Sequence, residues 1–278
     1  MRPPARIDAH LHFWQLDRGD YGWLTPALTP IYRDFLPADA QPWLDGAGID
    51  GVVAVQAAPT IAETRFLLDL AKREPRIRGV VGWVDMAAPD AAERIAELAA
   101  DPRLKGIRPM LQDLPADDWI LDPALGPAFA ALVRHGLRFD ALVKQHHLPH
   151  LLTLIERHPD LAVVVDHGAK PDIAAGAPAS WRAALAPIAA ATHVHCKLSG
   201  LLTEAAPGAG ADAIQPYAEV LFELFGADRL MFGSDWPVVT LRRSYAEWHC
   251  MAESLAEGLG EPERAALFGG TAARFYGL

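Results

Sequence analysis

Short apolar runs alternate with longer amphipathic segments along the whole chain. Eight of these runs are rich in Val, Ile and Leu, and they cover residues 6–12, 51–57, 77–85, 104–110, 137–143, 161–167, 193–199 and 229–235. Nearly continuous apolar runs of this length are typical of strands that are buried on both faces of a parallel sheet. Their alternation with helical segments predicts an α/β protein.

Helix signals lie between the predicted strands. Thr60-Ile-Ala-Glu63 is a capping box that predicts the helix Ile61–Arg73, and Ser244-Tyr-Ala-Glu247 predicts the start of another helix. Glycines stand where helix C-termini are expected, just before the next strand, at Gly48, Gly136 and Gly226.

Eight strand–helix alternations in 278 residues favour a closed (β/α)8 barrel over an open sheet. The first predicted strand ends in His-Leu-His, whereas an open nucleotide-binding sheet usually has a glycine-rich phosphate turn at this point. We therefore expect a single (β/α)8 barrel domain over residues 1–278.

One long segment, residues 13–42, interrupts this rhythm. It is rich in proline and aromatic residues, among them Trp14, Tyr21, Trp23 and Tyr32. A long loop in a compact domain is usually functional, and this one follows the first strand. We expect it to lie over the mouth of the barrel. A second loop is expected over the Ala/Gly/Pro-rich residues 205–213.

Composition restricts the partners. The net charge of −10 argues against binding to nucleic acid or to an anionic membrane, because both favour clustered Lys and Arg. The two cysteines, Cys196 and Cys250, have no metal-binding spacing, and a reducing compartment suits them. The chain begins without a secretion signal and has no apolar run of the roughly 18 residues that span a bilayer. These features predict a cytoplasmic protein; they indicate nothing about its oligomeric state.

Polar residues stand at the ends of several predicted strands. In a barrel these ends converge on one face, where catalysis takes place. The residues are His10 and His12 (first strand), Arg108 (fourth), Asp140 (fifth), Asp166 and His167 (sixth), Lys197 and Ser199 (seventh), and Ser234 and Asp235 (eighth).

Three histidines and an aspartate at the ends of the first, sixth and eighth strands form a joint pattern that chance seldom produces. Strand alternation places His10 and His12 on the same side. Lys197 has a structural alternative, since buried lysines are nearly always paired with carboxylates. Trp181 and Trp248 lie in predicted helices and are expected to pack in the core.

Two motifs, His10-Leu-His12-Phe-Trp14 and Phe232-Gly-Ser-Asp235-Trp-Pro237, resemble those of the amidohydrolase-2 branch of the amidohydrolase superfamily. Further segments resemble the L-fuconolactonase and L-rhamnonolactonase group of sugar lactonases: residues 17–26, 56–64, 80–85, 164–167 and 196–204. Together the matches run from residue 6 to about residue 245.

The resemblance implies a distorted (β/α)8 barrel in which His10, His12, His167 and Asp235 form the active site. Three histidines and an aspartate could hold one divalent ion, zinc or manganese. Arg108, however, stands where metal-bridging members carry a lysine or a carboxylate, and related lactonases are thought to work without metal. The expectation is therefore that no cofactor is required.

The resemblance implies a sugar lactone as the substrate, specifically an L-fucono-lactone-like compound, and it assigns each of these residues a role in opening the lactone. Asp235 is the expected base for water, His10, His12 and His167 orient water and carbonyl, and Arg108 stabilises the oxyanion. Substrate hydroxyls and the sugar ring are expected to contact Gln56, Asp140, Lys197, Trp14, Trp23, Trp83 and Trp236.

Two alternatives stay open. The first is a one-metal hydrolase or decarboxylase of the same branch, acting on another small carboxylate or lactone. The second is a non-catalytic barrel that binds a sugar acid; the presence of the whole set of hydrolytic residues counts against it.

Overall fold

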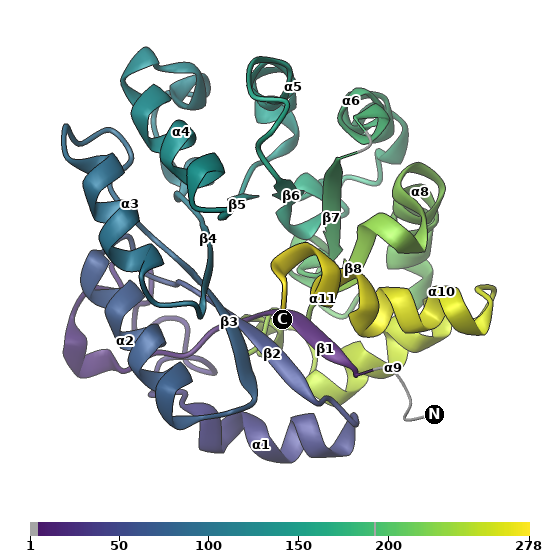
Figure 1. Ribbon diagram of the computed structural model, residues 1–278. Helices are drawn as coiled ribbons and strands as arrows, with labels where there is room; N and C mark the ends of the chain where they lie inside the picture. Colours follow the sequence, from purple (N-terminus) through teal and green to yellow (C-terminus); the bar gives the residue numbers. More distant parts are fainter. Residues whose placement is uncertain (1–4, 192) are drawn as a thin grey trace.

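Eight parallel strands form one sheet in chain order in the computed structural model, which describes residues 5–191 and 193–278 (Figure 1). The strands are β1 (Ile7–Leu11), β2 (Gly51–Val55), β3 (Ile77–Gly82), β4 (Leu104–Ile107), β5 (Arg138–Ala141), β6 (Val163–Val165), β7 (Val194–Leu198) and β8 (Leu230–Phe232). Each lies within one of the eight predicted apolar runs, so all eight predicted strands are confirmed. The strands end before the runs do. Most of the predicted polar residues therefore belong to the loops that follow, whereas His10, Asp140 and Lys197 lie within strands.

Backbone hydrogen bonds beyond the strand ends link β8 to β1. The His12 amide donates to the Trp236 carbonyl at 2.7 Å, and the Asp235 amide donates to the His10 carbonyl at 2.8 Å. A parallel bridge between Leu11 and Trp236 lies between these bonds. The sheet is thereby closed into the predicted (β/α)8 barrel, and the two motifs at opposite ends of the sequence lie side by side.

Helices surround this barrel (Figure 1). They are α1 (Pro37–Gly46), α2 (Ile61–Arg73), α3 (Ala91–Ala99), α4 (Gly126–Arg134), α5 (Leu148–Arg157), α6 (Pro178–Ala190), α7 (Leu201–Glu204), α8 (Ala211–Arg229), α9 (Tyr245–Leu255), α10 (Glu261–Ala265) and α11 (Thr271–Tyr276). In the described part of the chain, no helix is long and apolar enough to cross a membrane.

The predicted helix starts are confirmed. The Thr60 hydroxyl accepts from the Glu63 amide at 3.0 Å at the start of α2, and Ser244 and Glu247 form the reciprocal capping box of α9. The Glu63 carboxylate does not return to Thr60; it accepts instead from the amide of Ala57 and from the hydroxyl of Tyr21. Gly48 and Gly136 adopt positive φ after α1 and α4, whereas Gly226 kinks α8 before its end.

The predicted loop over residues 13–42 is too long. Helix α1 begins at Pro37 and contains Pro42, and proline is well suited to a first helical position because its φ is fixed near the helical value. An antiparallel bridge between Trp14 and Phe35 joins the two ends of the part of this segment that precedes α1. The predicted loop over residues 205–213 is also too long, because α8 begins at Ala211.

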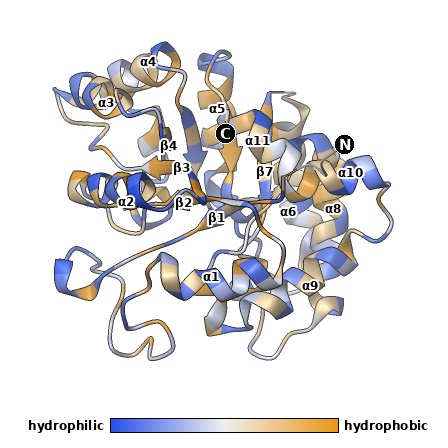
Figure 2. Ribbon diagram, turned by 60° about the horizontal axis from the view of Figure 1, so that its bottom comes forward, coloured by the Kyte–Doolittle hydropathy of each residue, from blue (hydrophilic) through white to orange (hydrophobic). Residues whose placement is uncertain are grey.

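Apolar side chains fill the barrel and the layer outside it. Inside, residues such as Val53, Val81 and Met231 pack against Phe275 and Tyr276 of α11, so the C-terminal helix closes the floor of the barrel. Figure 2 shows hydrophobic strands at the centre and hydrophilic residues on the outer helices. Trp181 and Trp248 are buried in the helix layer, as predicted.

Candidate active site

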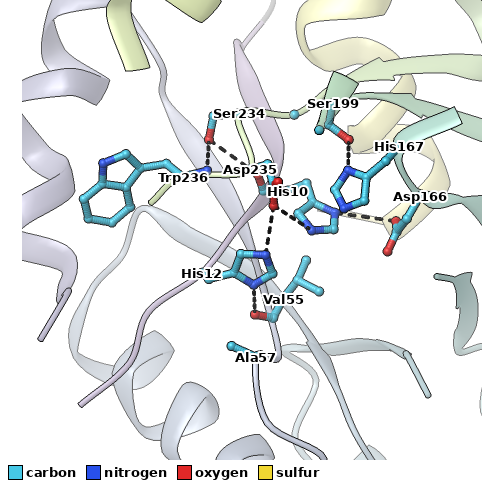
Figure 3. A network of polar contacts seen from close by, with 12 residues as sticks. His10, His12, Val55, Ala57, Asp166, His167, Ser199, Ser234, Asp235 and Trp236 are labelled. Carbon is cyan, nitrogen blue, oxygen red and sulfur yellow. Dashed lines mark hydrogen bonds and ion pairs between the residues drawn. The ribbon is translucent and has the colours of Figure 1, made fainter. Parts of the chain in front are cut away.

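The predicted polar residues converge at the C-terminal ends of the strands (Figure 3). His12 Nε2 lies 3.1 Å from Asp235 Oδ1, and His10 Nε2 lies 3.7 Å from the same oxygen. The rings of His10 and His167 are 4.5 Å apart between centroids. All four side chains are buried. The barrel therefore assembles the three histidines and the aspartate that the sequence places on three separate strands.

A cavity of about 270 Å³ opens beside this cluster. His12, Arg108, His167 and Asp235 line it, while His10 lies behind them. The other lining residues are Trp23, Ala57, Met110, Gln112, Asp113, Leu142, Lys170 and Val238. This volume lies just below the range of roughly 300–1,000 Å³ that is typical of small-molecule sites.

Unusual backbone geometry positions two of the cluster residues. His167 and Asp235 have φ of 55° and 57°, in the left-handed region that residues other than glycine seldom adopt. Ala169 and Lys170 also have positive φ, so the described non-glycine residues with this conformation all follow β6 or β8. Each such residue costs about 1–3 kcal/mol, and this strain is typical of active sites.

Asp235 is ionised at neutral pH. Burial by itself raises its pKa, but the neighbouring His167 and the hydrogen bond with His12 outweigh that effect and hold the pKa below its usual value. Burial lowers the pKa of His167 to about 4. Burial and the charge of Lys197 lower the pKa of His10 well below its ordinary value. The site thus contains a carboxylate able to accept a proton, and the His10 and His167 imidazoles beside it are neutral.

The geometry of His12 suits a bound cation. Its Nδ1 lies 2.8 Å from the Val55 carbonyl and therefore carries a proton, which leaves Nε2 facing Asp235. In neutral His12, Nε2 and the carboxylate oxygen would both be acceptors, and a proton or a metal ion between them removes this conflict. The ligand atoms of His10, His12 and Asp235 lie within 4.8 Å of one another, as do those of His10, Asp166 and His167.

Two permanent cations stand close to the same histidines. Arg108 Nη1 is 3.4 Å from His10 Nε2, and Lys197 Nζ is 3.2 Å from His10 Nδ1. Positive charges at these distances repel a metal ion. The donor set therefore fits one ion on the His12–Asp235 side, and the surrounding charges weaken its binding.

Arg108 is held in place from two sides. One of its terminal nitrogens donates to the Gln56 carbonyl, and the other donates to Asp166 Oδ2 at 3.3 Å. Gln56 in turn donates from Nε2 to the Arg108 carbonyl at 2.8 Å. Gln56 is fully buried and does not line the cavity, so its position supports Arg108 rather than the predicted contact with substrate.

Lys197 and Asp140 lie beneath the site, inside the barrel. Lys197 Nζ donates to Asp140 Oδ2 at 2.6 Å and is 3.0 Å from Asp166 Oδ1. Tyr276 also donates to Asp140, at 2.6 Å. Both Lys197 and Asp140 are fully buried and neither lines the cavity, so the predicted contact with substrate hydroxyls does not match their positions. The structural alternative for Lys197, pairing with a carboxylate, is the arrangement observed.

The charges of this buried group stabilise one another. Burial by itself lowers the pKa of Lys197, but Asp140 and Asp166 outweigh it and hold the pKa above its ordinary value. Burial raises the pKa of Asp140, against the opposing effect of Lys197. Burial also acts to raise the pKa of Asp166, yet Lys197 and His10 hold it well below its usual range.

The four predicted aromatic contacts take different positions. Trp23 lines the cavity and donates to the Ala57 carbonyl at 2.7 Å. Trp14 and Trp236 are buried, and both pack edge-on against Phe35 behind the cavity wall, so neither can touch a ligand there. Trp83 lines a neighbouring cavity.

Three residues of the site were absent from the sequence-based prediction: Lys170, Gln112 and Asp113 line the cavity. Ser199, which was among the predicted strand-end residues, contacts His167 Nδ1 through its hydroxyl at 2.8 Å. Lys170 stands close to a strand end and could have been included on that basis. Gln112 and Asp113 lie in a loop whose direction the sequence does not specify.

Comparison with known proteins shows the family of this chain. The chain is 49% identical over 275 residues to L-fucono-1,5-lactonase of Burkholderia ambifaria, covering 98% of this chain and 95% of that protein. It is 42% identical over 286 residues to L-fucono-1,5-lactonase of Burkholderia multivorans, covering 98% and 96%. A crystal structure of a B. multivorans amidohydrolase with bound zinc superposes with a TM-score of 0.94 at 41% identity over 99% of each chain. The family model described as amidohydrolase matches residues 7–278. The chain belongs to the amidohydrolase family.

Proposed function

We propose that this protein hydrolyses a sugar lactone and that L-fucono-1,5-lactone, or an aldonolactone closely similar to it, is the substrate. The similarity to two L-fucono-1,5-lactonases over nearly the whole chain supports the substrate class. The observation that carries the chemistry is an ionised, buried Asp235 that faces the same small cavity as the Arg108 guanidinium.

In the proposed reaction Asp235 accepts a proton from water, and the water oxygen attacks the lactone carbonyl carbon. The bond from that carbon to the ring oxygen then breaks. The proton passes from Asp235 to the departing alkoxide, which gives the open aldonic acid and returns the carboxylate to its starting state. General-base help of this kind is typically worth about 10²–10⁴ in rate.

Arg108 provides fixed positive charge for the oxyanion that forms during attack. Its guanidinium is already held by Gln56 and Asp166, so little reorganisation is needed. Loss of one such donor typically costs about 10²–10³ in rate. His12 and His167 line the cavity on the side of Asp235 and can orient the attacking water.

A metal ion is compatible with these residues but is not part of the proposed steps. His10, His12 and Asp235 would hold it, and it would supply Lewis-acid polarisation of water or carbonyl. An ester carbonyl needs less activation than an amide, and Arg108 already stands beside the cavity. The predicted cytoplasmic location and the predicted lack of nucleic-acid and membrane partners rest on composition and stay predictions.

The test is the substitution Asp235→Asn, assayed on L-fucono-1,5-lactone with a pH indicator. We expect kcat to fall by at least about 10²-fold, because the amide cannot accept the proton. Asp117→Asn, at an exposed position, is the matched control. Near-wild-type turnover by a folded Asp235→Asn protein would refute the mechanism, and tight lactone binding without turnover by the wild type would favour the non-catalytic alternative.

A further inference from the structure

A second and larger cavity adjoins the catalytic one. Its volume is about 600 Å³, against about 270 Å³ for the catalytic cavity. Trp23, Met110 and Asp113 line both cavities, so the two spaces meet at these three side chains. A lactone with a single ring has no need of this second space, because the proposed chemistry takes place entirely in the first.

Residues from three successive strand ends build the second cavity. Pro59 follows β2, the segment from Trp83 to Ala87 follows β3, and the segment from Pro109 to Leu114 follows β4. Asp20 and Trp119 complete the wall from separate loops. The cavity therefore extends from the catalytic centre across the β2–β4 side of the barrel mouth.

The lining is chemically distinct from that of the catalytic cavity. Three tryptophans, Trp23, Trp83 and Trp119, provide flat apolar surface, and each is partly exposed. Three aspartates line the same space, Asp20, Asp85 and Asp113, and Asp20 is paired with Arg18 at 2.8 Å. Among the described residues that line this cavity there is no Lys, Arg or His, whereas Arg108 and Lys170 line the catalytic one.

This combination selects a class of ligand. Asp85 and Asp113, with no basic residue in the described lining, disfavour a phosphate or a carboxylate by charge repulsion. Carboxylate oxygens accept hydrogen bonds from hydroxyl groups, and tryptophan faces pack on apolar surface. The indole N–H groups of Trp83 and Trp119 donate to no described residue, unlike that of Trp23, which donates to the Ala57 carbonyl, so they are available to a ligand. A neutral, polyhydroxylated ring matches all of these features.

We propose that the second cavity is a subsite for a neutral sugar unit joined to the lactone, so that the enzyme opens lactones of disaccharides as well as of monosaccharides. The proposal rests on the proposed lactonase function. With the lactone ring beside Asp235, the glycosidic bond lies where the cavities meet, near Trp23 and Met110.

The test compares L-fucono-1,5-lactone with the same lactone carrying a β-glucosyl unit on one hydroxyl at a time. At least one glucosylated lactone is expected to have a kcat/KM about five- to tenfold higher through a lower KM, the size of one aromatic packing interaction. Trp119→Ala should abolish this gain and leave hydrolysis of the parent lactone within about twofold. Trp43→Ala, at a tryptophan exposed on α1, is the matched control and should keep the gain.

A second variant guards against misfolding of Trp119→Ala. Ala87 is exposed and lines the cavity, so Ala87→Trp fills the space without disturbing the core, and it should also abolish the gain. The proposal is overturned if every glucosylated lactone is poorer than the parent, if the gain survives both variants, or if a benzyl substituent gives the same gain as glucose. Calorimetry with the glucosylated aldonic acid tests the subsite even if no lactone is hydrolysed: the acid should bind wild type more tightly than Ala87→Trp. This measurement separates failure of the subsite proposal from failure of the proposed function.

Discussion

Replacement of Lys197 by methionine tests the buried charge network beneath the active site. Methionine has a similar length and no charge, so the change removes the ammonium group with little loss of packing. Asp140 loses the partner at 2.6 Å but keeps the hydrogen bond from Tyr276. Asp166 loses a cation at 3.0 Å but keeps Arg108 at 3.3 Å. The substitution therefore leaves two buried carboxylates without their shared ammonium group, and the remaining contacts with Tyr276 and Arg108 replace it only in part.

Removal of one member of a buried ion pair typically costs about 3–5 kcal/mol, because the other charge stays buried without a partner. Asp140 can escape part of this cost by taking up a proton, since burial already raises its pKa. A carboxyl group whose pKa is higher in the folded than in the unfolded state stabilises the fold below that pKa and loses the effect as pH rises. We therefore expect a loss of about 3 kcal/mol or more at pH 8 and a smaller loss at pH 5.

The assay is urea unfolding followed by tryptophan fluorescence at both pH values. Lys72→Met, which removes a half-exposed ion pair with Asp69, is the control and should cost no more than about 0.5 kcal/mol. The double variant Lys197→Met/Asp140→Asn should cost less than the sum of the single variants, because the second change removes the unpaired charge. A loss below about 1 kcal/mol at pH 8, together with simple additivity, would refute this account.

Three further predictions concern the site and its walls. Hydrolysis should survive dialysis against a strong chelator, with metal loss verified by elemental analysis, whereas Arg108→Met should lower kcat by about 10²–10³-fold. Activity that follows metal content and returns with zinc or manganese would contradict this. Gly200→Ala should lower kcat and the melting temperature together, because a Cβ would lie 2.4 Å from His167 Nδ1 at a φ of +63°; unchanged kinetics would show that the ring can move freely. Trp14→Ala should lower the melting temperature with little change in KM, and Trp23→Ala should raise KM more than it lowers the melting temperature; the reverse pattern would place the ligand against Trp14.

Local sequence determined the strands, the starts of α2 and α9, and the position of the site. Apolar runs must be buried wherever they occur, and capping residues satisfy free amides of their own helix, so neither depends on distant parts of the chain. Once eight strands form a barrel, their C-terminal ends meet on one face. This is why the convergence of His10, His12, His167 and Asp235 could be predicted from the sequence.

The direction and depth of individual side chains depended on the tertiary structure. The pairing of β1 with β2 shifts register between Asp8 and Leu11, an irregularity that re-aims neighbouring side chains and leaves no mark in the sequence. Lys197 precedes the end of its strand, and its side chain lies in the barrel interior. There it donates to Asp140 of β5, which also accepts from Tyr276 of α11. Only the stagger of neighbouring strands decides whether such a residue reaches the cavity or the layer below it.

The walls of the two cavities were likewise decided by contacts between segments far apart in the chain. Trp14 and Trp236 follow β1 and β8, yet neither lines the cavity, because both are buried and pack edge-on against Phe35. Asp20, Trp83 and Trp119 lie on three separate loops and meet only because strands β1 to β4 bring those loops to one side of the mouth. The sequence specifies which residue types follow each strand, but loop direction results from packing against other loops, and that packing forms only in the folded barrel.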